Sequence, residues 1–173
     1  MTPLTTIHPR LHIGDDSDAT ALLRTVRRGT GPWQVEPAED WHIIHAAKTP
    51  WHATMAGYPQ GSAAPEDSPE RWWADRPRRT ALNLVDSPHQ LEELVLPILD
   101  HAAKRISQHL ATGGRVLVHC NMGHSRSPAT ALWWMHRTLP HETCEDQSQQ
   151  LLANYPDARL DTGIGNLVRR AWK

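Results

Sequence analysis

The chain has 173 residues and a formal net charge of −1 at pH 7. This length suits one domain with a buried core, and without a run of basic residues we expect no nucleic-acid partner. The N-terminus lacks the apolar segment of a signal peptide, and no stretch is long enough to span a membrane, so no membrane contact is expected. Two cysteines, Cys120 and Cys144, do not make a disulfide framework. We therefore expect a single domain over residues 1–173 that acts as a monomer in the reducing cytoplasm.

The first half of the chain contains three segments with the apolar pattern of strands and one with the pattern of a helix. The predicted strands cover residues 7–13, 41–47 and 80–85. Residues 18–28 carry apolar side chains on one helical face, and Gly29 is a typical helix stop. The pair Gly31-Pro32 predicts a turn.

Helical periodicity dominates the second half. Apolar residues recur at helical spacing from Leu91 to Leu110, and Pro97 predicts that this helix either begins near that proline or kinks there. The further predicted elements are a strand at 115–119, a helix ending near Thr138, and helices from Cys144 to Asn154 and from Gly163 to Trp172. Strands that alternate with helices predict an α/β fold, with a central, mostly parallel sheet of about four or five strands flanked by helices.

The segment from Val116 to Pro128 combines a strand, a small polar loop and the start of a helix. An apolar run typical of a buried strand leads to Cys120, which stands where the strand ends. Residues 121–125 are mostly small or polar and include Gly123, so their backbone N–H groups can turn inward and bind an anion. The helix N-terminus adds partial positive charge at the same place. The pattern predicts a phosphate-sized anion site beside a thiol.

Three side chains of this segment can act on a phosphoryl group. Helix N-termini and nearby cations favour the deprotonated thiol, so we expect Cys120 to be a thiolate nucleophile. Arg126 offers a planar fork of donors that suits two phosphate oxygens. Ser127 can donate a hydrogen bond to the sulfur when the sulfur leaves. His119 is expected to orient the loop rather than to act as a base.

The residues His-Cys-Asn-Met-Gly-His-Ser-Arg-Ser at 119–127 resemble the signature loop of the cysteine-dependent protein tyrosine phosphatases, and the Gly-x-Ser-Arg-Ser-Pro ending resembles their dual-specificity branch. Residues 7–15 are similar to the opening strand of that branch, and residues 82–86 to the strand and loop that carry its general acid. The chain looks most like a compact bacterial or phage-type form with an unusual middle segment. The resemblance implies a phosphatase-type three-layer α/β sandwich. It also implies that the loop binds the substrate through Asn121, Met122, Gly123, His124 and Ser125.

Asp86 is the expected second catalytic group. A phosphate ester needs a proton donor for its leaving oxygen, and the upstream candidates are Asp75, Asp86 and Asp100. Asp86 ends an apolar strand and opens a loop, whereas Asp100 falls within a predicted helix. The phosphatase resemblance implies a general acid at about this distance before the cysteine. The implied mechanism has two steps through a cysteinyl phosphate, with Asp86 as acid and then as base, and it needs no metal or other cofactor.

The least regular stretch covers residues 48–79 and is rich in proline and tryptophan. A loop of this length in a compact domain is usually functional or mobile. It leaves a strand beside the predicted catalytic end of the sheet, so Lys48, Trp51 and His52 are candidates for the pocket rim, as is His89 in the Asp86 loop. The alternative is a surface excursion that tryptophans hold in place. The histidines show no zinc-ligand spacing with cysteine, so we expect no metal site.

These residues favour phosphatase chemistry, with a phosphorylated protein or a small phosphoester as the substrate. Inositol, lipid or RNA 5′-phosphates remain alternatives, although the loop lacks the lysines that would favour a polyanionic headgroup. A sulfurtransferase or an arsenate reductase can use a similar cysteine loop, but a sulfur carrier needs no acid at Asp86. A phosphate-binding module without catalysis is a third class, and the presence of Cys120, Asp86 and Arg126 argues against it.

Overall fold

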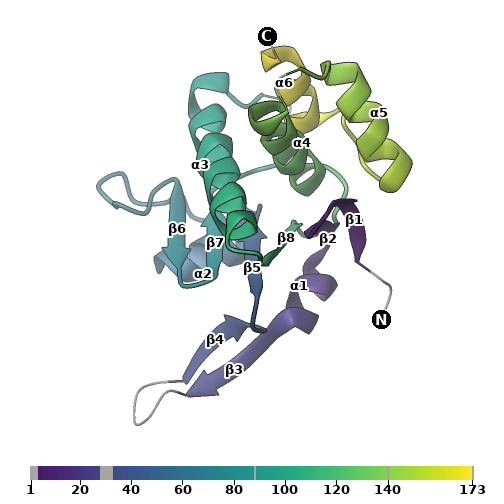
Figure 1. Ribbon diagram of the computed structural model, residues 1–173. Coiled ribbons are helices and arrows are strands. Elements are labelled where there is room, and N and C mark those ends of the chain that lie inside the picture. Colours follow the sequence, from purple (N-terminus) through teal and green to yellow (C-terminus); the bar gives the residue numbers. More distant parts are fainter. Residues whose placement is uncertain (1–3, 28–32, 88, 140, 173) are drawn as a thin grey trace.

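A six-stranded sheet lies at the centre of the computed structural model, which describes residues 4–27, 33–87, 89–139 and 141–172 (Figure 1). Its strands lie in the order β1 (Thr5–His8), β2 (Leu11–Gly14), β8 (Arg115–His119), β5 (Trp41–His45), β7 (Arg79–Leu82) and β6 (Trp73–Arg76). Strands β2, β8, β5 and β7 are parallel, and β1 and β6 pair antiparallel at the edges. The predicted α/β class is confirmed. The sheet has more strands than expected because each edge adds a short antiparallel strand.

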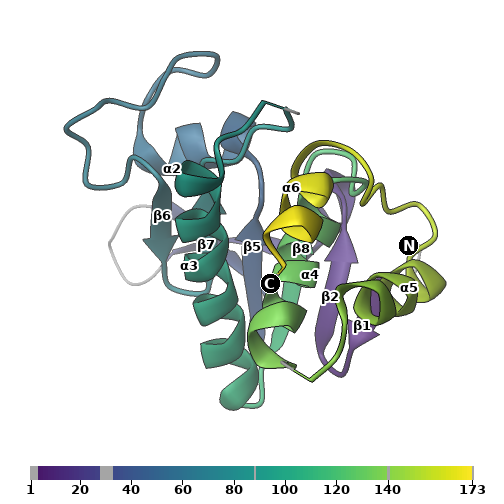
Figure 2. The same ribbon diagram turned by 90° about the horizontal axis from the view of Figure 1, so that it is seen from above.

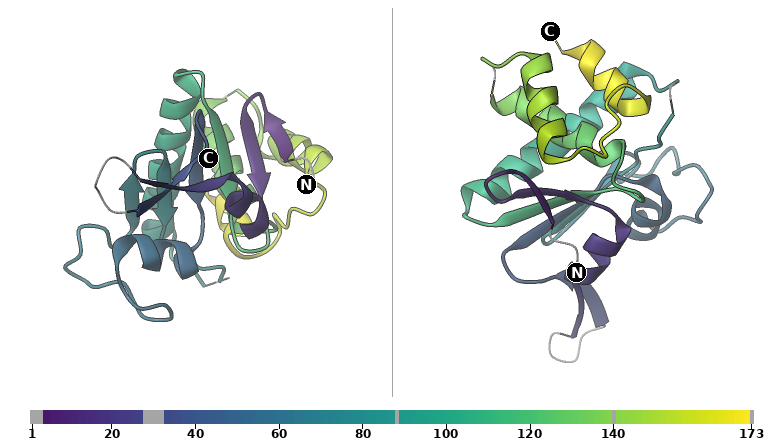
Figure 3. Two further views of the ribbon diagram at one scale, coloured as in Figure 1. Left: turned by 90° about the horizontal axis from the view of Figure 1, so that it is seen from below. Right: turned by 90° about the vertical axis from the view of Figure 1, so that its right-hand side faces the viewer.

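Helices lie on both faces of the sheet. The thicker layer contains α3 (Glu92–Ala111), α4 (Arg126–Thr138), α5 (Cys144–Asn154) and α6 (Gly163–Ala171) (Figure 2). The other face is covered by α1 (Asp16–Leu22), and by the irregular helical turn η1 (Lys48–His52) with α2 (Ala53–Ala56). Strands β3 (Leu23–Arg27) and β4 (Trp33–Pro37) form a separate hairpin on this second side (Figure 3). No helix in the described part of the chain is long and apolar enough to cross a membrane.

Alternation along β8 decides which side chains face each layer. Val116 and Val118 belong to the core beneath α3, α4 and α6, whereas Leu117 packs with Ala19 of α1. These side chains are fully buried, and a buried Val or Leu typically contributes about 1.5–3 kcal/mol by leaving water. This alternation of side chains between the two faces continues past the end of the strand. Cys120 therefore packs in the core of the thicker layer, whereas His119 lies against Asp16 at the start of α1.

Two predictions in the N-terminal part are wrong. The strand expected over residues 7–13 is a hairpin, because Arg10 adopts a left-handed conformation (φ 68°) between β1 and β2. The helix expected over residues 18–28 is the shorter α1, which begins after its cap Asp15 and ends at Leu22. The residues that follow pair with β4, the next strand along the chain, instead of continuing the helix. The predicted stop at Gly29 and turn at Gly31-Pro32 lie outside the described residues.

The later elements follow the predictions more closely. Helices α4, α5 and α6 and strand β8 are confirmed within a residue or two. Helix α3 begins at Glu92, so a start near Pro97 is wrong. Pro97 is exposed inside the helix, where water can bond the carbonyl that loses its partner. The segment 48–79 is partly regular, with η1, α2 and β6 within it.

Candidate active site

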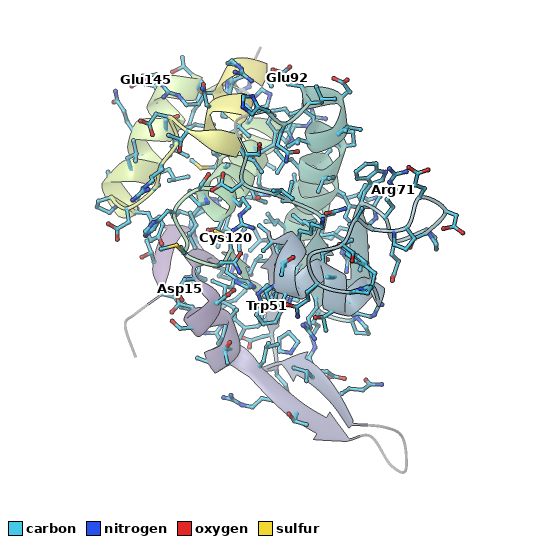
Figure 4. The ribbon with its side chains drawn as sticks, turned by 180° about the vertical axis from the view of Figure 1, so that it is seen from behind. Asp15, Trp51, Arg71, Glu92, Cys120 and Glu145 are labelled. Carbon is cyan, nitrogen blue, oxygen red and sulfur yellow. The ribbon has the colours of Figure 1, made fainter. Side chains whose placement is uncertain are left out.

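Cys120 lies at the end of β8, where the chain turns toward α4, and its side chain is largely buried. Figure 4 shows it above Asp15 and Trp51 on this face of the molecule. Its Sγ is 3.4 Å from the Oγ of Ser127, and this Oγ also donates to the carbonyl of Gly123 over 3.0 Å. The hydroxyl can therefore accept from a thiol or, after rotation, donate to a thiolate.

The backbone of the cysteine loop (residues 120–126) turns its carbonyls outward. The carbonyls of Gly123, His124 and Ser125 accept from Ser127 Oγ, the Arg159 N–H and the Ala129 N–H, over 3.0, 2.7 and 3.0 Å. Within the described part of the chain, no hydrogen bond has a backbone N–H of residues 121–126 as its donor. Free N–H groups in such a loop, next to the N-terminus of α4, form a concave site suited to an anion.

Gly123 is required by this loop geometry. Its φ is +76°, a conformation that L side chains rarely adopt. A Cβ at this position would also lie 2.4 Å from the hydroxyl of Tyr155 and 3.2 Å from the carbonyl oxygen of Gly14. The loop is therefore held tightly between β2 and the segment after α5, and a larger residue would displace it.

Arg126 keeps part of its bonding capacity free. One terminal nitrogen, Nη2, donates to Asn121 Oδ1 over 2.7 Å, and Nη1 approaches the carbonyl of Leu84 at 3.4 Å. The buried Nε has no hydrogen-bond partner in the described structure. A buried donor without a partner is costly unless a ligand satisfies it. The guanidinium is thus fixed by Asn121 and open toward a tetrahedral anion.

Asp86 lies in the same hollow as Cys120. This hollow, of about 160 Å³, is lined by Asp86, Cys120, Met122, His124, Ser125, Arg126, Arg159 and Thr162. The carboxylate accepts a hydrogen bond from Ser125 Oγ over 2.9 Å and is otherwise exposed. A carboxyl group at the mouth of an anion site can exchange protons with a bound ester oxygen.

The other two candidate acids lie elsewhere. Asp75 accepts hydrogen bonds from Thr80 and pairs with His101, and these bonds outweigh its burial and lower its pKa to about 2. Asp100 accepts from the indole N–H of Trp133 on α4 over 2.9 Å. Neither lines the hollow beside Cys120.

Comparisons with known proteins agree on one architecture. Human DUSP28 aligns over 99% of this chain and 94% of its own, with a TM-score of 0.61 and 15% identity. The human tyrosine phosphatase-like serine/threonine/tyrosine-interacting protein aligns over 96% and 93%, with a TM-score of 0.62 and 17% identity. The tyrosine phosphatase OH1 from the Orf virus aligns over 98% and 86%, with a TM-score of 0.56 and 20% identity.

The chain has the dual-specificity and tyrosine phosphatase fold. Neither the models of protein families nor the curated proteins match it. One of the structural neighbours is described as phosphatase-like and as an interacting protein, so the phosphatase fold by itself does not establish catalysis. The residues of the site decide whether the chain can catalyse a reaction.

Beneath the cysteine loop, Arg79, His45, His119 and Asp16 form a relay whose two imidazoles are fully buried. His45 and His119 are register neighbours on β5 and β8, and their Nδ1 and Nε2 atoms are 2.5 Å apart. Arg79 Nε donates to His45 Nε2 over 3.1 Å, which leaves the His45 proton on Nδ1, directed at His119. The His119 proton then lies on Nδ1, 3.3 Å from Asp16 Oδ1.

The relay fixes Asn121, and through it Arg126. Asp16 accepts from Trp51 Nε1 over 2.8 Å and from Asn121 Nδ2 over 3.2 Å. Asn121 therefore presents its Oδ1 to Arg126. Burial lowers the pKa of His45 and of His119, so both imidazoles are neutral at pH 7. Burial would raise the pKa of Asp16, but the nearby His119 imidazole and the hydrogen bonds from Trp51 and Asn121 outweigh this effect, so the group is ionised.

The four predicted rim residues lie in different environments. Lys48 lines a second hollow of about 360 Å³ that shares Asp86 and Arg126 with the first. The prediction for His52 is wrong, because its side chain is fully buried and bonded to the Tyr58 hydroxyl and the Glu70 carbonyl. Trp51 lines neither hollow and instead stacks on His45 under the loop. His89 is exposed and also lines neither hollow.

Several residues at the site were missed by sequence reasoning. Arg159 and Thr162 reach the hollow from the segment between α5 and α6, far along the chain from Cys120. Asp16 is the first residue of α1, two residues after the end of β2, and polar residues at a sheet end are candidates for a site. Among the described residues, no three His, Cys, Asp or Glu side chains are placed to hold a metal ion.

Proposed function

We propose that the protein is a cysteine-dependent phosphomonoester hydrolase of the protein tyrosine and dual-specificity type. The observation that carries this proposal is the cysteine loop, whose free N–H groups and unpartnered Arg126 Nε surround the space next to Cys120. A phosphoryl group has the charge and the three oxygens to occupy these donors. The fold shared with the phosphatases supports the same reading.

In the first step, Cys120 Sγ attacks phosphorus. An S–P bond forms, the P–O bond to the leaving group breaks, and Asp86 gives its proton to the leaving oxygen. Arg126 and the loop amides hold the equatorial oxygens, which carry negative charge throughout. The Ser125 hydroxyl holds the Asp86 carboxyl over the hollow in the meantime.

In the second step, a water molecule attacks phosphorus and the S–P bond breaks. Asp86 takes the proton of the water, and Ser127 donates a hydrogen bond to the departing sulfur, 3.4 Å away. Inorganic phosphate is released. Splitting one displacement into two easier ones is nucleophilic catalysis.

The position of Asp86 favours a phosphatase over a sulfurtransferase. Sulfur transfer uses a cysteine loop but has no leaving oxygen that needs a proton at this place. Asp86 stands over the hollow and is bonded to the loop itself through Ser125. Substrates are expected among phosphorylated proteins, with aryl phosphoesters as simple surrogates.

The test is hydrolysis of 4-nitrophenyl phosphate and of a phosphotyrosine peptide in the presence of EDTA. We expect full turnover under these conditions, because Arg126 and backbone amides supply the positive charge. Activity that disappears with the chelator and returns with Mg²⁺ or Zn²⁺ would contradict the proposal. So would an absence of phosphate release from both substrates.

A further inference from the structure

Helix α6 begins in direct contact with Asp86. Gly163, the first residue of α6, has a φ of +50°. A Cβ built on Gly163 would lie 2.2 Å from Asp86 Oδ1 and 3.3 Å from Ser125 Oγ. Side-chain carbons do not approach other atoms as closely as 2.2 Å. Only a glycine therefore allows the helix and the carboxylate to occupy their present positions together.

The helix itself is firmly held. Ile164, Leu167 and Val168 are buried in the core beneath α6, so the first turn of the helix has no room to withdraw. Gly165 lies within α6, and a Cβ built there would lie 2.7 Å from Leu160 Cα, which shows how closely the segment before the helix passes. Leu160 is buried as well.

The backbone below Asp86 is equally constrained. Leu84, two residues earlier, is buried, and its carbonyl accepts the Lys48 N–H over 2.9 Å. By contrast, the Asp86 side chain is exposed and is held by one hydrogen bond, from Ser125. A new side chain at Gly163 would therefore move the Asp86 carboxyl rather than the helix or the strand.

The same contact places the carboxylate at a favourable electrostatic position. Thr162, the cap of α6, makes no side-chain hydrogen bond to the first turn of the helix. The N–H groups at a helix start carry partial positive charge, which attracts a carboxylate. Asp86 thus lies between the start of α6 and the Ser125 hydroxyl, which donates its one hydrogen bond.

We propose that Gly163 is a positioning residue for the general acid: its missing side chain lets α6 hold the Asp86 carboxyl over the leaving oxygen. This rests on the proposed function of Asp86. Gly163 itself touches neither the substrate nor the sulfur in this account. Gly163 contributes only to the protonation of the leaving oxygen. A residue that merely supports the fold would not affect this step selectively.

The experiment compares Gly163→Ala with the wild type on two substrates, phenyl phosphate and an aryl phosphate with a strongly acidic leaving phenol. A poor leaving group needs the proton and an activated one needs little help. We expect kcat for phenyl phosphate to fall by about tenfold or more, within the worth of a general acid. For the activated ester we expect a change within about twofold. In Gly163→Ala, the basic limb of the pH–rate profile should be flatter than in the wild type.

Gly57→Ala is the matched control. Gly57 also has a left-handed φ, of +77°, and nothing lies within 4 Å of a Cβ built there. The control carries similar backbone strain without a contact to Asp86. It should lower the melting temperature by a similar amount and leave the leaving-group dependence as in the wild type.

Two double variants test whether Gly163→Ala acts through Asp86. In an Asp86→Asn background, Gly163→Ala should cause no additional loss with phenyl phosphate, because the acid is already gone. In an Asp86→Ala background, Gly163→Ala should destabilise the protein no more than Gly57→Ala does, since the clashing oxygen is absent. The second comparison applies even where the single Gly163→Ala protein folds poorly.

Equal losses for both substrates in Gly163→Ala, or an unchanged leaving-group dependence, would overturn the proposal. So would poor folding of Gly163→Ala that persists in the Asp86→Ala background. Failure of the proposed function gives a different result, since Asp86→Asn itself would then show no selective loss with phenyl phosphate.

Discussion

The cysteine loop and the buried relay beneath it use polar groups in opposite ways. In the loop, the backbone N–H groups of residues 121–126 and the Nε of Arg126 have no protein partner among the described residues. In the relay, three of the four imidazole nitrogens of His45 and His119 have a hydrogen-bond partner, and the fourth, His119 Nδ1, lies 3.3 Å from Asp16 Oδ1 without a hydrogen bond. The reactive part leaves most of its donors free, and the supporting part uses most of its hydrogen-bonding groups.

This contrast gives each part a different expected response to substitution. Changes in the loop should affect the rate far more than the stability. Changes in the relay should affect the stability first, and the rate only through Asn121 and Arg126. The following predictions separate the two responses, beginning with the largest effect.

Arg126→Lys should reduce kcat/KM on the order of 10³-fold or more, the scale of arginines that stabilise phosphoryl transfer. An ammonium group cannot reproduce the planar fork that holds two oxygens. Steady-state kinetics with 4-nitrophenyl phosphate measure this loss. The control is Arg137→Lys, which changes a surface ion pair with Asp100 and should retain activity. Turnover near that of the wild type in Arg126→Lys would contradict the role of the guanidinium.

Asp86→Asn should lower kcat for an alkyl or phenyl phosphate by roughly 10²–10⁴-fold and for an activated aryl phosphate much less. The amide keeps the shape of the carboxyl and cannot donate a proton to the leaving oxygen. The basic limb of the pH–rate profile should flatten in the variant. Asp100→Asn, on α3, should behave as the wild type. If the limb and the leaving-group dependence survive in Asp86→Asn, the acid is another residue, and His89 is the next to test.

Asp16→Ala should lower kcat/KM by roughly 10- to 100-fold, the effect typical of a group that orients a reacting one. Asn121 would lose one of the two acceptors of its Nδ2, leaving the Thr49 carbonyl at 3.1 Å, and its Oδ1 would be held less firmly toward Arg126. Asp15→Ala is the neighbouring control, since Asp15 caps α1 and should cost about 1 kcal/mol of stability without a comparable loss of rate. Equal kinetic losses in both variants would mean that α1 as a whole, and not Asp16, supports the loop.

The free energy of unfolding should fall as the pH drops below about 6.5. Burial, followed by Arg105, lowers the pKa of His42 to about 3, and burial also lowers the pKa values of His45 and His119. The unfolded chain takes up these protons and the folded chain does not. The stabilisation is therefore complete above about 6.5 and is lost toward about 3 for His42, with a slope of up to about 1.4 kcal/mol per pH unit for each imidazole.

Urea unfolding at pH 7, 6, 5 and 4 measures this slope. His42→Asn should make it shallower by up to one proton. His141→Asn is the control, since His141 is exposed. Equal stability at pH 7 and pH 5 would show that the buried imidazoles are protonated in the fold.

The parts of the fold that could be predicted are those where a run of residues has a clear strand or helix pattern and is bounded by residues that end it. The run from Val116 to Pro128 contains its own strand, loop and helix start, and Gly113-Gly114 separates it from α3. The N-terminal part could not be predicted, because the apolar spacing of residues 18–28 also suits a helix and only pairing with β4 ends α1 at Leu22. Pro9 favours a turn before Arg10, but a positive φ is uncommon for an arginine.

The site also has one part that could be predicted from the sequence and one part that could not. The cysteine loop could be predicted because its residues are contiguous. The bonds that complete it join distant segments: Ser125 to Asp86, Asn121 to Asp16, and the start of α6 to both Asp86 and Ser125. Such contacts depend on the tertiary fold. His52 shows the reverse error, since a polar residue beside the site proved to be buried with satisfied hydrogen bonds.

The central claim is that Cys120 carries the phosphoryl group, and trapping the intermediate tests it most directly. Asp86→Asn protein is mixed with an activated aryl phosphate, quenched in acid after milliseconds and digested for mass spectrometry. The variant hydrolyses the intermediate slowly because the base is missing, so the peptide with Cys120 should gain one phosphoryl group. The same peptide from Asp86→Asn, Cys120→Ser protein should gain none. A phosphoryl group on another residue, or no adduct together with continued turnover in Cys120→Ser, would contradict the account.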